Sequence, residues 1–339
     1  MSLTPSSLGS LANYSSTLSV LLNDQGGIID DTIITKHSSE SFYVVTNAGR
    51  STEDKAHIDA KLKEWNSMSE NKGKEVKWET MDGWGLVALQ GPKAAEVLQT
   101  MVELDLTSIK FGQSAHVEID GAKCHIARGG YTGEDGFEVG PFHYYLIQAD
   151  GQISIPPQKA VEITQKLASH ADVQLIGLGA RDSLRLEAGM CLYGNDLDES
   201  VSPVEAGLTW VIGNSTHFTN GVELTRTGKD RRTESSAPFP GRSRILQEIA
   251  NGPIRRRVGF EIIGSPAREG CKIFDSAGVQ EIGVITSGIP SPTLGANIAM
   301  GYVANGQHKK GTKVKVEVRK KMRDAIVRPM PFVPSKYYK

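Results

Sequence analysis

GLGARDSLRLEAGMCLYGNDL, at residues 177–197, is the stretch that says most about the fold of this chain. Glycines precede a run with helical spacing of apolar residues, which predicts a helix over Leu178–Ala188. Charged side chains fall on the first two turns of that helix: Arg181, Asp182, Arg185 and Glu187. Asp182 is favourable near the positive N-terminal end of a helix, whereas Arg181 is unfavourable there and indicates an anionic partner. The alternative is a surface network of Arg181–Asp182 or Arg185–Glu187 pairs.

The sequence downstream changes character after about residue 250. Short strands separated by turns are predicted there, with no helix-length pattern among them: Val258–Ile263, Cys271–Phe274, Ile282–Thr286, Thr312–Arg319 and Ala325–Met330. This pattern is typical of a small β barrel, which we expect to be a domain of its own at 250–339. The basic, Pro/Ser-rich stretch Thr225–Arg244 is the expected linker. In the PVEAGLTW segment (203–210), Trp210 is expected to pack in the core.

Upstream of residue 177, predicted strands and helices alternate. Strands at Thr17–Leu22, Thr32–Thr35 and Phe42–Val45 predict a β meander, with a turn at Gly26-Gly27. Further elements are expected: helices at Glu53–Met68, Lys93–Met101 and Lys159–His170, a strand at Leu86–Leu89, and a hairpin formed by His116–Ile119 and Lys123–Ala127. Residues 1–249 are therefore expected to form a region separate from the barrel.

Two carboxylates stand together in GGIIDDTIIT, at residues 26–35. Asp30 and Asp31 lie between the Gly-Gly turn and a predicted strand. Because adjacent residues on a strand face opposite sides, only one of the two carboxylates can point into a given cavity. The alternative is that the pair accepts hydrogen bonds from the turn amides.

A glycine-rich motif, GGYTGEDGFE, follows at residues 129–138. It has neither the glycine order of a dinucleotide site nor the Lys-Ser or Lys-Thr ending of a phosphate loop. Glycines let the backbone approach a flat ligand closely. Glu138 can then accept two hydrogen bonds from an amino-pyrimidine edge. The alternative is a turn that carries a solvated carboxylate.

Composition excludes several function classes. The formal net charge of -1 argues neither for a nucleic-acid partner nor for a membrane surface, and no apolar run reaches the ~20 residues of a membrane span. Cys124, Cys191 and Cys271 are too widely spaced for a disulfide framework or a CxxC metal site, so we expect a reducing compartment. Neither a histidine pair with ligand spacing nor a GxSxG motif is present. His116 and His125 are expected on the hairpin, packed or exposed rather than catalytic.

These blocks and the C-terminal MPFVPSKYYK (330–339) occur in order and together resemble the aminomethyltransferase (T-protein) family of the glycine cleavage system. The resemblance runs from about Ser16 to Lys339, and SLRLEAGMCLYGND (183–196) is its most specific piece. It implies an α+β fold: a folate-binding body of two intertwined α+β domains around a central channel over 1–249, and a small C-terminal β barrel over 250–339. It implies an activity as well. The aminomethyl carbon passes from the lipoyl arm of H-protein to tetrahydrofolate, giving methylenetetrahydrofolate, ammonia and dihydrolipoyl H-protein.

The resemblance assigns roles to individual residues. Asp31 matches an acidic residue beside the folate N5/N10 edge, which it would orient while assisting proton transfer. Glu138 matches a carboxylate that pairs with the pterin, and Arg181 an arginine that lines the folate pocket. Tyr337 matches a C-terminal tyrosine that reaches the folate. Two further folate contacts are implied in matching segments: Tyr131 and Asn47. The resemblance implies neither a metal nor a nucleotide.

The implied partner is lipoylated H-protein, an acidic carrier, and the implied location is the mitochondrial matrix. A basic face should then steer this partner by its charge. The candidates are Lys229, Arg231, Arg232 and Arg255–Arg257. Neither a nucleic acid nor a membrane is expected as a partner.

The chain departs from the family pattern in three places. It lacks the family's upstream segment and any targeting sequence, so we expect an N-terminally truncated chain whose pocket is open on one side. Val139–Gln152 and Asn214–Thr227 interrupt segments that are continuous in the family. We expect these insertions to be retained introns, and the alternative is genuine surface loops.

Three rival functions follow from the same fold. A folate-binding iron–sulfur assembly factor would carry a cysteine-containing KGCYxGQE-like motif where this chain has GGYTGEDG. The folate domain of a sarcosine or dimethylglycine dehydrogenase would be joined to a flavin domain with a GxGxxG start, which this sequence does not contain. The third rival is an inactive truncated fragment.

Overall fold

The computed structural model describes residues 3–81, 84–141, 157–213 and 239–339. These residues divide into two compact units, each built from separate pieces of the chain. Unit 1 comprises Met1–Ser6, Ser19–Asp31 and Gly177–Ser335. Unit 2 comprises Ser7–Leu18, Thr32–Ile176 and Lys336–Lys339. Among the described helices, none has both the length and the apolar composition that crossing a membrane requires.

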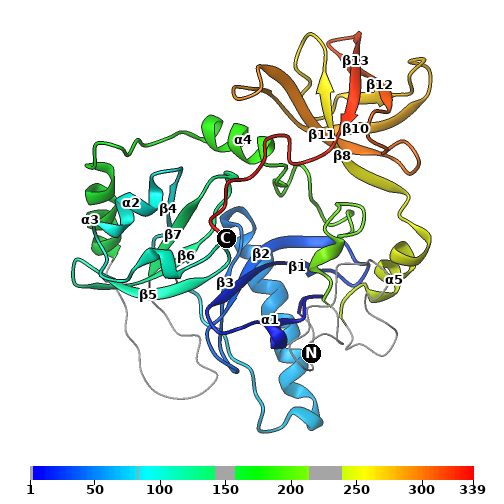
Figure 1. The fold of residues 1–339 in the computed structure, drawn as a ribbon. Coiled ribbons are helices and arrows are strands. Elements are labelled where there is room, and N and C mark those ends of the chain that lie inside the picture. Colours follow the sequence, from blue (N-terminus) through cyan, green and yellow to red (C-terminus); the bar gives the residue numbers. More distant parts are fainter. Residues whose placement is uncertain (1–2, 82–83, 142–156, 214–238) are drawn as a thin grey trace. The chain divides into compact units, whose positions relative to one another are not determined.

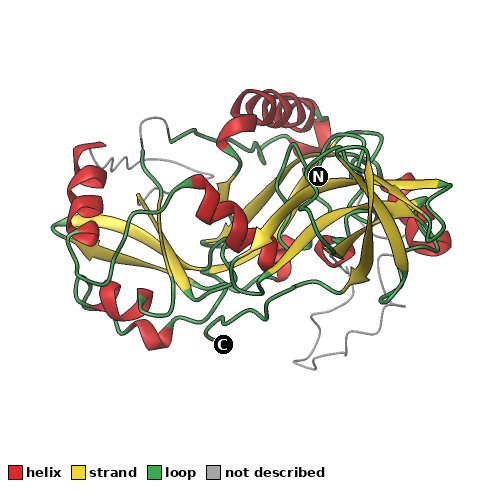
Figure 2. Ribbon diagram, turned by 90° about the horizontal axis from the view of Figure 1, so that it is seen from above, coloured by secondary structure: helices red, strands yellow, loops and turns green. Residues whose placement is uncertain are grey.

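A four-stranded sheet forms the centre of unit 2, in the order β4-β7-β6-β5 (Figure 1). Its strands are antiparallel: β4 (Val87–Gln90), β5 (Ser114–Ile119), β6 (Ala122–Arg128) and β7 (Gly136–Pro141). Helices α2 (Ala94–Gln99) and α3 (Pro157–Ala168) pack against it (Figures 1 and 2). The shared core consists of apolar side chains from these elements: Leu89, Leu98, Ile119, Ile126, Phe137, Ile163 and Leu167. The predicted hairpin is confirmed, and Asp120 and Gly121 turn it with φ of 50° and 72°.

The predicted meander is also confirmed, as a three-stranded sheet in the order β1-β2-β3. The strands are β1 (Ser15–Leu22), β2 (Ile28–Lys36) and β3 (Phe42–Val45), and helix α1 (Ser51–Ser67) follows them. The side chain of Asn23 organises the turn, because its Oδ1 accepts hydrogen bonds from the amides of Gln25 at 3.0 Å and Gly27 at 2.8 Å. Both aspartates lie within β2 itself, and their interpretation as acceptors of turn hydrogen bonds stays an alternative.

A closed barrel occupies the C-terminal part of unit 1, in the order β10-β11-β8-β13-β12-β9 (Figure 1). Its strands are β8 (Arg255–Ile262), β9 (Lys272–Phe274), β10 (Glu281–Ser291), β11 (Ala296–Ala304), β12 (Lys313–Val318) and β13 (Lys321–Arg328). Closure pairs every strand on both sides and leaves no open edge. The expected small barrel and the α+β class are thus confirmed, while the boundary at 249/250 stays a prediction.

Strand β11 was absent from the sequence-based prediction, because its ANIAMGYVA sequence is poor in the β-branched residues that favour strands. Packing explains the glycine it contains. A Cβ atom at Gly301 would lie 2.3 Å from the carbonyl oxygen of Val284 on β10. The requirement for glycine at this position therefore comes from the closely paired neighbouring strand.

Two further expectations about unit 1 are wrong. Helix α5 (Arg242–Asn251) occupies the end of the stretch predicted as a linker, Thr225–Arg244, whose residues up to 238 lie outside the described residues. Trp210 was expected in the core, yet it is 57% exposed. It lies in the short 3-10 helix Thr209–Val211, where Val211 is the buried residue.

The glycine-rich motif of unit 2 packs around the side chain of Gln90. The amide nitrogen of Gln90 donates to the carbonyl of Gly129 at 2.9 Å, and its oxygen accepts from the Thr132 hydroxyl at 2.8 Å. A Cβ at Gly130 would lie 2.0 Å from the Gln90 oxygen, and one at Gly136 would lie 2.6 Å from the Leu89 carbonyl oxygen. Glycine is thus required here because the backbone of the motif approaches strand β4 of the same protein closely.

We therefore expect Gly136→Ala to destabilise the protein by about 1–3 kcal/mol, because the added methyl group has no room beside Leu89 and Gln90. Gly129→Ala is the matched control in the same motif, since nothing lies within 4 Å of a Cβ built there. Urea denaturation of both variants measures the difference. Equal midpoints for the two variants would show that the motif tolerates side chains throughout.

Candidate functional site

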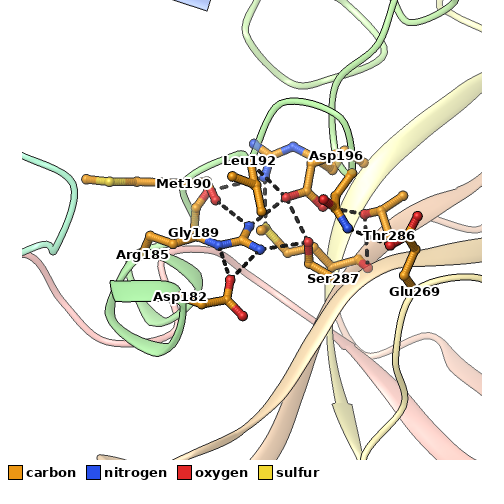
Figure 3. A network of polar contacts seen from close by, with 12 residues as sticks. Asp182, Arg185, Gly189, Met190, Leu192, Asp196, Glu269, Thr286 and Ser287 are labelled. Atoms are coloured by element: carbon orange, nitrogen blue, oxygen red, sulfur yellow. Dashed lines mark hydrogen bonds and ion pairs between the residues drawn. The ribbon is translucent and has the colours of Figure 1, made fainter. Parts of the chain in front are cut away.

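The central feature of the 177–197 motif is Arg185, which is only 2% exposed (Figure 3). It lies on helix α4 (Leu178–Glu187) and makes an ion pair of 2.6 Å with the fully buried Asp196. A second ion pair of 2.8 Å joins it to Asp182, one turn earlier on the same helix. Arg185 also donates to the Ser287 hydroxyl at 2.8 Å, and Ser287 lies on β10 of the barrel.

Asp196 completes this network from the other side. Its carboxylate accepts hydrogen bonds from the amide of Leu192 at 2.9 Å, the Ser287 hydroxyl at 2.9 Å and the Thr286 hydroxyl at 2.5 Å. A buried ion pair is tolerated only when its remaining polar groups are satisfied in this way. The network therefore holds together, within unit 1, helix α4, the segment around 190–197 and strand β10 (Figure 3).

The predicted Arg185–Glu187 surface pair is therefore wrong, because both residues are buried and each has other partners. Glu187 accepts hydrogen bonds from the hydroxyls of Ser291 at 2.5 Å and Thr293 at 2.7 Å. The sequence pattern correctly marked this helix as special but assigned its charges to the wrong neighbours. The hydroxyl groups that bind Arg185 and Glu187 lie more than a hundred positions further along the chain, whereas the carboxylates that pair with Arg185 are those of Asp182 and Asp196.

Asp31 lies in β2, in the part of that strand that belongs to unit 1. Asp30 is fully buried and Asp31 half-buried, as expected for adjacent residues that face opposite sides of a strand. The start of β2 is attached to the 177–197 motif, because the hydroxyl of Tyr193 donates to the carbonyl of Ile28 at 2.9 Å. The structure thus brings the Asp-Asp motif and the CLYGND segment together, although some 160 positions separate them in the sequence.

The carboxylate of Asp31 acts electrostatically on the thiol of Cys191. The pKa of the Cys191 thiol is raised to about 11. Burial is the main cause, and the negative charges of Asp196 and Asp31 contribute to the rise. Arg257 and Arg185 oppose these effects. At neutral pH the Cys191 side chain is therefore a neutral thiol. Arg181 is exposed on the first turn of α4, in the same unit as Asp31.

Glu138 lies in unit 2, in the middle of strand β7. It is paired with Ala88 on β4 and with Ala127 on β6, and it is half-buried. The interpretation of this motif as a turn with a solvated carboxylate is thus wrong at Glu138. A strand position with neighbours on both sides holds its backbone rigidly.

Arg128 is the residue of unit 2 that sequence reasoning missed. It is 4% exposed and forms a bidentate ion pair with Asp135 of the glycine-rich motif, with distances of 3.0 Å and 2.6 Å. Its other guanidinium nitrogen donates to the carbonyls of Leu106 and Ile109, both at 2.8 Å. The bidentate pairing of the planar Arg128 guanidinium with the Asp135 carboxylate fixes the position of the glycine-rich motif.

The C-terminal residues of the chain lie against the same motif. The amide of Lys336 donates to the carbonyl of Gly133 at 2.8 Å, and its ammonium pairs with Glu134 at 2.9 Å. The ring of Tyr337 stacks on Phe111, with centroids 3.9 Å apart and planes at 18°. The ring of Tyr338 lies 3.9 Å from the Arg128 guanidinium. The structure therefore brings Tyr337 to the segment that contains Tyr131 and Glu138.

The predicted site residues thus fall into two groups, one in each unit. Asp31 and Arg181 belong to unit 1. The others belong to unit 2: Tyr131, Glu138, Tyr337 and Asn47. Asn47 is exposed at the end of β3, where it precedes the short 3-10 helix Ala48–Arg50.

The structure describes only some of the basic residues that are expected to steer a partner. Lys229, Arg231 and Arg232 lie outside the described residues, as do 142–152 and 214–227 of the two insertions. Arg255–Arg257 form the start of β8. Arg255 pairs with the buried Glu205 at 3.2 Å, Arg256 donates to Asn305 at 3.1 Å, and Arg257 donates to the Ala206 carbonyl at 2.8 Å.

Unit 2 also contains a group of histidines that sequence spacing did not reveal. His37, His116 and His125 bring one imidazole nitrogen each to within 4.8 Å of one another. Burial lowers the pKa of His37 and of His116 to about 4, and that of His125 to about 3. All three are therefore neutral at pH 7. Because they come from separate strands, no spacing along the sequence links His37 to the other two.

Comparison with known proteins shows a match over most of the chain. Residues 2–216 match the family described as "GCVT N-terminal domain", and residues 255–334 match "Glycine cleavage T-protein C-terminal barrel domain". A probable mitochondrial aminomethyltransferase of Schizosaccharomyces pombe is 46% identical over 339 residues, which cover 100% of this chain and 77% of that protein. The mitochondrial aminomethyltransferase of Saccharomyces cerevisiae is 43% identical, with 99% of this chain and 78% of that protein covered.

A solved structure agrees with these matches. The crystal structure of glycine cleavage system aminomethyltransferase T from Bartonella henselae superposes with a TM-score of 0.78 at 34% identity. The superposition covers 99% of this chain and 81% of that one. Since the N-terminal match spans more than half of the sequence and the second match covers the barrel, the chain belongs to the glycine cleavage T-protein family.

Proposed function

We propose that this protein is a tetrahydrofolate-dependent aminomethyltransferase of the glycine cleavage system. It transfers the aminomethyl carbon from the lipoyl arm of H-protein to tetrahydrofolate and releases ammonia. The observation that carries this proposal is the similarity to aminomethyltransferases along the whole chain, at 46% identity for the S. pombe protein. The iron–sulfur assembly factor is not favoured, because the curated relatives are named as aminomethyltransferases.

The location follows from the same relatives, which are named as mitochondrial proteins in yeasts and plants. We place this protein in the mitochondrion and, more finely, in the matrix. A direct assay tests the activity of the chain as it stands. The purified protein, supplied with tetrahydrofolate and aminomethylated H-protein, should release ammonia. Folate binding without ammonia release would instead support the rival interpretation of an inactive fragment.

In the proposed reaction Asp31 orients the N5/N10 edge of the folate and assists proton transfer as N5 attacks the methylene carbon. Its half-buried carboxylate suits this role, because it combines access to a ligand with a defined position on β2. Arg181 lines the folate site and neutralises an anionic group of the ligand. Both residues belong to unit 1, next to or within the motif that the Arg185–Asp196 pair holds.

The neutral Cys191 thiol also favours this chemistry. The aminomethyl carbon is electrophilic, and a thiolate is a far better nucleophile towards it than a thiol. Because burial and two carboxylates raise the pKa of Cys191 to about 11, little thiolate is present at neutral pH.

The proposed folate contacts that belong to unit 2 are Glu138, Tyr131, Tyr337 and Asn47. Glu138 accepts hydrogen bonds from the amino-pyrimidine edge of the pterin. The fixed strand position of Glu138 supports this role, because its backbone is already ordered before the ligand binds. Tyr337 is held by its stack on Phe111 and contributes an aromatic face.

Asp31→Asn is expected to lower turnover about 100-fold or more while folate affinity changes little, because the carboxylate acts on proton transfer. The exposed Asp24 of the preceding turn supplies a matched control, Asp24→Asn. Ammonia release measures turnover and tetrahydrofolate titration measures affinity. Wild-type turnover in the Asp31 variant would remove this residue from the mechanism.

Glu138→Gln should weaken tetrahydrofolate binding by about 1–3 kcal/mol, since a charged hydrogen-bond acceptor becomes a neutral group of the same shape. Glu118→Gln is the control, because Glu118 is exposed on β5 of the same sheet. Calorimetric titration with tetrahydrofolate compares both variants with wild type. If the Glu138 variant binds as tightly as wild type, the pterin is recognised elsewhere.

Association with H-protein should weaken as salt is raised, because the Debye length shrinks from about 10 Å at 0.1 M to about 3 Å at 1 M. We assign the steering charges to Lys229, Arg231 and Arg232, since Arg255 and Arg257 are engaged within unit 1. Replacing the three with alanine should reduce the salt dependence, whereas replacing Lys309 and Lys310, exposed near the barrel strands, should not. Titrations of H-protein at two salt concentrations measure this. An unchanged salt dependence in the triple variant would place the docking face elsewhere.

A further inference from the structure

Three histidines, two on strands and one just after a strand, meet in unit 2. His37 directly follows β2, His116 lies on β5 and His125 on β6. His116 and His125 are opposite each other in the antiparallel register of the hairpin, so their side chains share one face of the sheet. The ring centroids are 5.1 Å apart for His37 and His116, 5.0 Å for His37 and His125, and 5.4 Å for His116 and His125. The three rings thus form a nearly equilateral triangle.

The nitrogen atoms of this triangle are close to the spacing that a metal ion requires. One nitrogen from each ring lies within 4.8 Å of the other two. Zinc binds imidazole nitrogen at about 2.0–2.1 Å, so two tetrahedral ligands are about 3.4 Å apart. Binding of the ion would therefore require the rings to turn towards one another.

We propose that His37, His116 and His125 form a binding site for a single Zn²⁺ ion. The donor set consists only of imidazole nitrogen, which suits zinc among the metal ions common in proteins. Three protein ligands leave one position for water. His116 is only half-buried, which provides a path for the ion and for that water. The site concerns metal binding and does not depend on the proposed transferase function.

Burial distinguishes this cluster from ordinary surface histidines. His37 is 4% exposed and His125 is 2% exposed, yet each ring carries two polar nitrogen atoms. Within the part of the chain that the structure describes, Nε2 of His125 is buried and has no hydrogen-bond partner. A buried polar atom of this kind is costly unless something binds it.

Two tyrosines pack against the imidazoles. The ring of Tyr43 is parallel to His37 within 1°, and its centroid lies 5.0 Å from that of His125. Tyr14 meets His116 edge to face, with centroids 5.3 Å apart. Packing of this kind serves equally as an aromatic core, so the alternative to a metal site is a cluster of histidines that only fills space. A bound ion would join the end of β2 to the β5–β6 hairpin and raise the stability of unit 2.

The test uses the full chain without an affinity tag, stripped of metal by a chelator and dialysed. Co²⁺ serves as the spectroscopic probe, because its visible absorption reports a tetrahedral nitrogen environment, and Zn²⁺ is then added in competition. His116→Ala removes one proposed ligand at its most accessible position. His308→Ala is the matched control, since His308 is also half-buried and lies in the other unit. Circular dichroism shows whether each variant folds.

The wild type and His308→Ala should bind one equivalent of Zn²⁺ and gain thermal stability from it. His116→Ala should bind Zn²⁺ more than about 100-fold more weakly than the wild type. Loss of an outer-shell partner alone weakens metal binding about 10–100-fold. X-ray absorption on the zinc-loaded wild type should show three imidazole ligands, which decides the matter even if His116→Ala does not fold. Any of three results would overturn the site and leave the aromatic core. They are the absence of tetrahedral Co²⁺ absorption in the wild type, equal Zn²⁺ affinity of wild type and His116→Ala, and fewer than three imidazole ligands on the zinc.

Discussion

Much of unit 1 depends on one buried ion pair, Arg185–Asp196. Removing either partner would leave an uncompensated charge in the interior, which typically costs about 3–5 kcal/mol. Helix α4, the segment that follows it and strand β10 all contribute groups to the pair, so none of them can move independently of the others. Asp31 and Cys191 lie beside this assembly, and the electrostatic coupling between them depends on it. The most specific stretch of the sequence is therefore also the one with the greatest structural role.

Local patterns in the sequence predicted the elements of secondary structure well. The meander, the hairpin at Asp120-Gly121 and helix α4 follow from spacing and turn residues, which act between near neighbours. The opposite facing of Asp30 and Asp31 was predictable for the same reason, since it depends only on the geometry of a strand. Closure of the barrel followed from many short strands, although the Ala- and Gly-rich β11 was not visible.

Contacts between distant residues could not be read from the sequence. The hydroxyl groups that bind Arg185 and Glu187 lie on or just after strand β10, and their identity depends on how the barrel packs against α4. Arg128 gave no signal, because its bidentate partner Asp135 was counted only as part of a glycine-rich turn. The exposure of Trp210 shows the limit of a composition rule. Tryptophan is highly buried on average, but an individual tryptophan can still lie at the surface. The candidate folate residues came from family resemblance, and structure adds their surroundings.

The interleaving of the two units has a consequence for dividing the protein into fragments. Unit 1 consists of the pieces Met1–Ser6, Ser19–Asp31 and Gly177–Ser335, and unit 2 consists of the residues between them together with Lys336–Lys339. No single cut in the sequence therefore releases either unit with all of its pieces. A fragment that stops at Ser335 would lack Tyr337 and Tyr338, which contact Phe111 and Arg128 within unit 2.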